Sequence, residues 1–328
     1  QLTPGGEVNN LGVYAFEERT LGDWTVQLGL RHDWHETVGD AGDTRGPLNF
    51  SGRDQNDYAA TTGSLGAVYS VTDHLSVVSN LARGFRAPSL FELYANGVHA
   101  GVAAVQQGNA NLDEEVSLNT DLGVRWREDG FSGKVTVYRN RIDDYIFLQD
   151  SGNTAGNGLP IFNYRQADAT LTGVDLEVRG HVIENLELAA TYSAVDGEND
   201  ATGQDLPLQP ADAVTGEATW YLPGDGAVQT PYLRLGVRHN AAKDAAPGEP
   251  FQQFNGAPFG TASTDAYTVA NFAAGFGLGT AEGRRVQLDL KVHNLTDKRY
   301  RDFLDTYKGY ALSPGRDVRL EVRVPWSG

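Results

Sequence analysis

The chain has 328 residues, and 43 acidic against 26 basic residues give a formal net charge of -17. That charge argues against nucleic-acid binding, for which a basic surface is expected. Mean hydropathy is -0.39, and no apolar run approaches the ~20 residues that a membrane-spanning helix needs, so a helical membrane protein is excluded. A transmembrane β-barrel is not excluded, because only one face of each barrel strand is apolar.

The sequence contains neither cysteine nor methionine. The lack of cysteine fits a β protein outside the cytosol that does not rely on disulfides. Because there is no methionine, Gln1 is not a translation start. No signal peptide is visible either. We therefore expect the chain to be processed, truncated or incompletely represented.

Alternating apolar and polar residues predict thirteen β-strands. They fall near 11–19, 24–36, 57–70, 74–84, 117–127, 131–149, 161–180, 186–196, 212–221, 230–240, 266–278, 285–294 and 316–326. The last strand shows the pattern clearly, with an apolar row formed by Val318, Leu320, Val322, Val324 and Trp326. Successive side chains on a strand point to opposite faces, so each such strand has one aliphatic and one polar face.

The connections between these strands alternate in length along the chain. Short ones are expected at 20–23, 71–73, 128–130, 181–185, 222–229 and 279–284, and long ones at 37–56, 84–116, 150–160, 196–211, 240–265 and 295–315. This alternation is typical of transmembrane barrels, which have short periplasmic turns and longer outer loops. A soluble all-β protein with the aliphatic faces in a core is the alternative, although structureless loops of this length are uncommon in compact domains. We therefore predict an all-β fold, a transmembrane antiparallel β-barrel in the bacterial outer membrane and in contact with its lipid.

The positions of the tryptophans support a barrel with its short turns in the periplasm. Trp24, Trp126, Trp220 and Trp326 fall at the periplasmic ends of their strands, and Trp34 falls at an outer end. Amphipathic rings are enriched at the two membrane interfaces, although tryptophan packing near strand ends is an alternative explanation.

The predicted strand count is odd, whereas bacterial single-chain barrels have an even number of strands. An open sheet in lipid would leave backbone groups unpaired. Either one strand is miscounted or the chain is not a whole barrel. We favour the incomplete barrel, because the first strand should run toward the periplasm and ought to have a predecessor.

Catalysis has little support in the sequence. It contains no cysteine nucleophile, no Gly-x-Ser-x-Gly elbow, no phosphate-binding glycine loop and no His-Glu-x-x-His motif. We therefore expect a protein that is not an enzyme.

Metal capture has candidate residues at the outer end. Zinc prefers histidine together with carboxylates. A long outer loop carries one histidine and several carboxylates, and the outer end of the second strand places an aspartate and a histidine on one lumenal face. His32 lies on the opposite face. The candidate ligands are His99, Glu92, Asp113, Glu114, Asp33 and His35. Ordinary solvated histidines are the alternative explanation.

Three segments resemble TonB-dependent outer-membrane receptors: residues 79–94 (SNLARGFRAPSLFELY), 108–115 (GNANLDEE) and 294–300 (NLTDKRY), the last followed by Pro314, Gly315 and Arg316. The resemblance implies a 22-stranded barrel closed by an N-terminal plug, of which residues 1–328 would be the C-terminal part, without a plug in this chain. It also implies that Trp326 stands for the terminal aromatic residue that the barrel-assembly machinery recognises.

A narrower resemblance is to the zinc-uptake branch of these receptors. It rests on residues 93–100 (LYANGVHA) and 164–169 (YRQADA). It implies uptake of a scarce metal or metal chelate, with zinc ahead of ferric siderophore, powered by the TonB complex through a plug. No cofactor is firmly implied, and zinc or another divalent cation would be cargo. A passive, porin-like channel without a plug is the alternative function.

Overall fold

The computed structural model describes residues 2–3, 5–39, 55–251, 258–279 and 285–324. Thirteen strands pair in chain order in one antiparallel sheet. These strands are β1 (Gly6–Leu21), β2 (Trp24–Gly39), β3 (Gln55–Ser70), β4 (Leu75–Arg86), β7 (Glu115–Glu128), β8 (Phe131–Thr154), β9 (Pro160–Ile183), β10 (Leu186–Asn199), β12 (Ala213–Tyr221), β13 (Val228–Asn240), β14 (Tyr267–Gly279), β15 (Arg285–His293) and β16 (Asp317–Arg323). The predicted all-β fold and the thirteen strands are confirmed.

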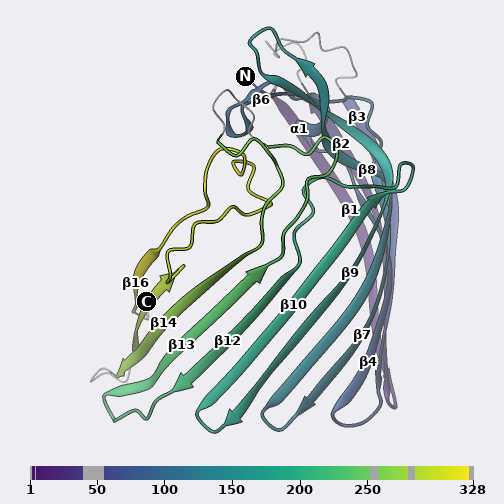
Figure 1. The fold of residues 1–328 in the computed structure, drawn as a ribbon. Helices are drawn as coiled ribbons and strands as arrows, with labels where there is room; N and C mark the ends of the chain where they lie inside the picture. Colours follow the sequence, from purple (N-terminus) through teal and green to yellow (C-terminus); the bar gives the residue numbers. More distant parts are fainter. Residues whose placement is uncertain (1, 4, 40–54, 252–257, 280–284, 325–328) are drawn as a thin grey trace.

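The sheet curves like the wall of a barrel, with β1 and β16 as its two edge strands in the described residues (Figure 1). Short turns join the strands at the lower end of the view, and longer connections gather at the upper end. Except between β8 and β9, this arrangement follows the predicted alternation of short turns and longer loops. No helix in the described ranges is long and apolar enough to cross a membrane.

Pairing registers set the two faces of the sheet. Leu122 on β7 pairs with Val137 on β8, which pairs with Val174 on β9, so aliphatic residues form a row across the strands. Leu122 and Val137 are 53 and 49 % exposed, and similar rows follow on neighbouring strands. A continuous exposed aliphatic surface of this extent marks contact with another apolar phase. In a barrel that phase is lipid, and we call this face the outer face.

The polar face carries charged side chains that form ion pairs across strands. Lys291 on β15 contacts Glu321 on β16 at 2.9 Å, and Arg323 contacts Asp289 at 3.3 Å. Cross-strand pairs of this kind contribute roughly 0.2–1 kcal/mol each. We call this polar side the inner face.

Four of the five tryptophans lie in the described residues. Trp24 begins β2, and Trp126 and Trp220 lie close to the ends of β7 and β12 that lead into short turns. Trp34 lies inside β2 rather than at its end, because that strand continues to Gly39. The fifth, Trp326, lies outside the described residues, and so does the end of the predicted last strand.

One predicted loop is wrong. Residues 150–160 were expected to form a long outer connection, but β8 and β9 each run for 24 residues and leave only 155–159 between them. A β-bulge between Ile142 and Tyr145 interrupts the register, and the hairpin continues beyond it. The register shifts again between Asp150 and Thr154, where the residues include no apolar side chain, so the sequence pattern ends β8 too early.

The connection between β4 and β7 is folded rather than irregular. It contains helix α1 (Leu90–Tyr94), the hairpin of β5 (Asn96–His99) and β6 (Ala104–Gln107), and a short 3₁₀ turn at Ala100–Val102. β6 pairs in parallel with β9, so this connection joins the main sheet. We call residues 87–114 the inner insert, because it packs against the inner face.

Three small apolar clusters hold the inner insert in place. Leu93, Tyr94 and Leu112 are 0 to 1 % exposed and pack with Ile146 of β8. Two further clusters centre on Phe162 and on Val105, again between the insert and the outer halves of β8 and β9. Most of the fully buried apolar side chains of the described chain therefore lie at the outer end.

Candidate functional site

Helix α1 begins at a capping box. The Ser89 hydroxyl accepts a hydrogen bond from the Glu92 backbone N–H at 3.3 Å, and the Glu92 carboxylate accepts one from the Ser89 N–H at 2.7 Å. This arrangement satisfies two backbone donors that the first helical turn leaves free. Glu92, a predicted metal ligand, therefore has a structural task.

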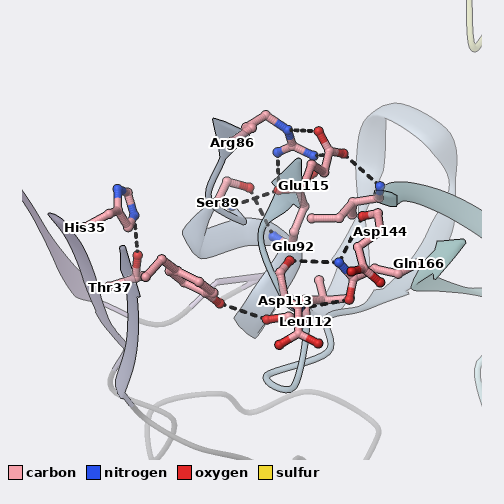
Figure 2. A network of polar contacts seen from close by, with 12 residues as sticks. His35, Thr37, Arg86, Ser89, Glu92, Leu112, Asp113, Glu115, Asp144 and Gln166 are labelled. Carbon is pink, nitrogen blue, oxygen red and sulfur yellow. Dashed lines mark hydrogen bonds and ion pairs between the residues drawn. The ribbon is translucent and has the colours of Figure 1, made fainter. Parts of the chain in front are cut away.

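Arg86 connects this helix to the start of β7. Its guanidinium donates to both carboxylate oxygens of Glu115 at 2.6 and 2.7 Å, and its third nitrogen donates to Glu92 at 2.8 Å (Figure 2). Glu115 also accepts from the backbone N–H of Ile146 on β8. A forked contact of this type fixes geometry as well as charge. One arginine therefore ties together both ends of the inner insert and the hairpin beside it.

Gln166 holds the last residues of the inner insert. Its amide oxygen accepts from the Asp113 N–H at 2.9 Å, and its amide nitrogen donates to the carbonyls of Asp113 and Asp144 at 2.8 and 3.0 Å (Figure 2). These contacts are made by the backbone of Asp113 rather than by its carboxylate. The structure therefore places Asp113 at the insert's junction with β8 and β9.

His99 ends β5 on the inner insert. Its ring lies 6.0 Å from the Phe91 ring, which lies 6.0 Å from the Tyr164 ring of β9. The Nδ1 atom of His99 is buried without a hydrogen-bond partner, and so is the amide oxygen of Gln106, a side chain only 3 % exposed. Buried polar atoms normally find partners, so unpaired atoms here indicate a place for a ligand or water. Sequence reasoning missed Gln106, because one glutamine in a loop carries no signal.

Asp33 and His35 lie on the inner face of β2, as predicted, but each already has a partner. Asp33 accepts a forked contact from Arg31 at 2.5 to 2.9 Å. A ring nitrogen of His35 lies 2.9 Å from the Thr37 hydroxyl. His32 contacts Thr61 and Trp34 on the outer face, so His32 and His35 point to opposite faces of β2.

The six predicted ligands do not form one cluster. In the part of the chain that the structure describes, no three His, Asp or Glu side chains are close enough to hold a metal ion together. Glu92 is held by Arg86, and Asp33 is held by Arg31. The Nδ1 atom of His99 is buried without a hydrogen-bond partner.

A second network joins three other outer connections. Lys308, between β15 and β16, contacts Glu249, between β13 and β14, at 2.9 Å, and the Glu249 carboxylate accepts from the Leu208 N–H at 3.0 Å. Lys308 also donates to the Phe303 carbonyl. Burial lowers the pKa of the Lys308 ammonium, although the bond to Glu249 opposes that shift. Three connections are thus tied together by one buried pair that no sequence pattern indicated.

The outer connections also meet the inner insert. A Cβ built on Gly101 would lie 3.6 Å from His99 Nε2 and 3.7 Å from the Tyr307 hydroxyl, so Tyr307 lies near His99. The backbone N–H of Asp150 donates to the Gly248 carbonyl. The insert, the β8–β9 hairpin and the outer connections therefore converge around the surroundings of His99.

Comparison with known proteins gives a family match over residues 1–295, to the model described as TonB dependent receptor-like, beta-barrel. Among curated proteins, the chain is 24 % identical over 276 residues to the heme/hemopexin utilization protein C of Haemophilus influenzae, covering 77 % of this chain and 36 % of that protein. It is 22 % identical over 296 residues to the vitamin B12 transporter BtuB of Photobacterium profundum, covering 90 and 40 %.

Solved structures agree on the fold. The copper transporter OprC superposes with a TM-score of 0.78 at 16 % identity, covering 97 % of this chain and 48 % of that one. The FrpB iron transporter of Neisseria meningitidis (F3-3 variant) gives a TM-score of 0.68 at 16 % identity, with 97 and 45 % covered. The chain therefore spans less than half the length of these relatives.

Proposed function

Because the chain belongs to the TonB-dependent receptor β-barrel family, whose members lie in the bacterial outer membrane, we propose that it forms barrel wall and outer loops of a receptor for a metal bound in an organic chelate. Energy would come from the TonB complex, acting on a plug inside the barrel. The relatives named above are transporters and receptors, which supports a role in uptake rather than catalysis.

The surroundings of His99 carry this proposal. A ring nitrogen of His99 is buried and unpaired beside Phe91, whose ring in turn lies near Tyr164, and the amide oxygen of Gln106 on the same hairpin is also buried and unpaired. Aromatic faces stack on flat organic ligands, and a neutral imidazole binds metals. A chelate with an aromatic frame would use both properties. The inner insert and the loops tied by Lys308 would hold these groups in place before the ligand arrives.

Bare zinc is the second candidate cargo. His99 and the resemblance of residues 93–100 to zinc-uptake receptors favour it. A zinc site normally needs about four ligands. The described residues offer no ready cluster, so further ligands would have to come from elsewhere in the receptor. We therefore rank a chelate ahead of the free ion.

Binding to the purified protein in detergent tests this proposal. Titrations with hemin, a ferric tris-catecholate and Zn²⁺ should show saturable binding of one chelate that weakens at least tenfold in His99→Ala. His74→Ala, at the opposite end of the sheet, should bind like the wild type, because the His74 ring lies 3.1 Å from the Arg127 carbonyl beside a short turn. Saturable Zn²⁺ binding alone would favour the second candidate. Equal binding by both variants would contradict the role of His99.

Channel recordings test the passive alternative. The protein in a planar bilayer should show no large steady conductance if a plug closes the barrel. A permanently open pore, combined with no saturable ligand binding, would support a porin-like channel instead.

A further inference from the structure

The outer face changes from aliphatic to basic side chains toward the outer ends of β4 and β8. Below, the row of Leu122, Val137 and Val174 is aliphatic. Above it, β8 carries Arg139 and Arg141 on the same face, and Arg141 aligns through Leu118 of β7 with Arg83 of β4. We call Arg83, Arg139 and Arg141 the arginine patch.

The registers place the arginine patch on the outside of the wall. Ile142, the neighbour of Arg141, points to the inner face and is only 9 % exposed, whereas Arg139 and Arg141 are exposed. Arg83 donates to the Thr61 carbonyl across the outer face of β3. Arg139 and Arg141 take part in no ion pair within the described residues. Two guanidinium groups are therefore free to bind an anion.

The height of the patch matches a membrane boundary. β8 begins at Phe131, next to a short turn, and Arg141 lies ten residues further along. At about 3.4 Å per residue and a tilt of about 40°, that separation is about 26 Å. The apolar belt of such barrels is about 25 Å tall, so the patch lies where outer-leaflet headgroups begin.

The patch is local rather than part of an even girdle. On β12 to β16, the described residues that point outward include no lysine or arginine, because Arg234, Arg238, Lys291, Arg319 and Arg323 all point inward. Threonines Thr170 and Thr172 lie beside the patch on β9, and Asp196 and Glu198 follow on β10 and limit it on that side. A cluster of three arginines is notable in a chain whose net charge is -17.

We propose that the arginine patch binds the phosphate groups of an anionic glycolipid in the outer leaflet, such as a phosphorylated lipid A. Arginine suits this ligand because its planar fork donates two hydrogen bonds to a phosphate. The Thr172 hydroxyl, opposite Arg139, adds a donor, and the aliphatic rows below receive the acyl chains. The inner face has no part in this site, which is separate from the surroundings of His99.

Native mass spectrometry of the detergent-purified protein with added bisphosphorylated lipid A tests the proposal. The wild type should retain the lipid, and Arg139→Gln/Arg141→Gln should bind it more weakly, by about fivefold for each arginine removed. Arg139→Lys/Arg141→Lys should keep most of the affinity. Arg125→Gln, which removes one positive charge from the inner face, should bind like the wild type.

Two further measurements distinguish a phosphorylated lipid from other ligands. Lipid A without phosphates should bind no better to the wild type than to the double variant, and inorganic phosphate should not displace the phosphorylated lipid. Equal retention by the wild type and the double glutamine variant would overturn the proposal, as would an equal loss in Arg125→Gln. Displacement by inorganic phosphate would show a free-anion site rather than a lipid site. Tryptophan fluorescence spectra matching the wild type confirm that each variant is folded.

Discussion

The ammonium of Lys308 lies 2.9 Å from a carboxylate oxygen of Glu249, and these side chains are 0 and 2 % exposed. Such burial of a charged pair is uncommon on an outer loop, where water is close at hand. Breaking a buried pair costs far more than breaking an exposed one, because the remaining charge stays in a dry environment. The pair therefore makes three outer connections depend on one another.

Removing the lysine alone should loosen these connections. Lys308→Met is expected to lower the free energy of local opening by about 3–5 kcal/mol, because Glu249 remains buried without its partner. The double variant Lys308→Met/Glu249→Leu should recover most of that loss. Hydrogen exchange of residues 241–251 and 294–316 measures the effect. The control is Lys291→Met, because its partly exposed pair with Glu321 is screened by water and should contribute little. A single variant that exchanges like the wild type would contradict this account.

Arg86 should be needed to seat the inner insert. Arg86→Lys keeps the charge but loses the fork that holds Glu115 and Glu92 together. Hydrogen bonds to charged groups are worth about 1.5–3 kcal/mol, so we expect residues 87–114 to become sensitive to limited proteolysis while the barrel strands stay protected. Arg301→Lys, a change on another outer connection, is the matched control. Unchanged proteolysis in Arg86→Lys would show that the insert is held by its apolar clusters alone.

Gly108 should tolerate no side chain. A Cβ at this position would lie 2.6 Å from the Leu93 carbonyl carbon and oxygen, which are backbone atoms that cannot rotate away. Gly108→Ala should therefore displace helix α1 and weaken ligand binding near His99. Gly156→Ala is the control, because nothing lies within 4 Å of its Cβ. Equal thermal melting and equal ligand binding in the two variants would count against the packing described for the inner insert.

Charge should be costly on the outer face at mid-height. Leu122→Arg is expected to destabilise the folded barrel in lipid by about 2–4 kcal/mol if the site lies near the bilayer midplane. Thr136→Arg, one row away but on the inner face, should cost much less because that face is wet. Urea titration of folding into vesicles, followed by tryptophan fluorescence, gives both values. Similar costs for the two variants would argue against a lipid-facing Leu122.

The strands could be predicted because each carries its own signal. Alternation along Val318, Leu320 and Val322 requires no knowledge of the partners of the strand. The folded inner insert could not be predicted in this way, because its helix has five residues and its strands four each. Their stability comes from contacts with β8 and β9, which are distant in sequence. The end of β8 was missed because residues 150–154 include no apolar side chain and therefore show no alternation.

The candidate site was predicted only in part. His99 and the inner orientation of Asp33 and His35 follow from loop position and strand alternation. The ion pairs of Glu92 with Arg86 and of Asp33 with Arg31 could not be predicted. Only the folded chain shows that each guanidinium lies against the carboxylate. Lys308 and Glu249 are 59 residues apart, and nothing in the sequence pairs them.

Spin labelling tests the central claim most directly, since the absence of cysteine allows single labels without background changes. Labels on Leu122→Cys and Asp121→Cys, in protein reconstituted into vesicles, can be relaxed by oxygen, which concentrates in lipid, or by a nickel chelate, which stays in water. We predict that the label at 122 responds to oxygen and the label at 121 to the nickel chelate. A label at 122 that responds to neither reagent, as in a core between two packed sheets, would contradict the barrel and the uptake function built on it.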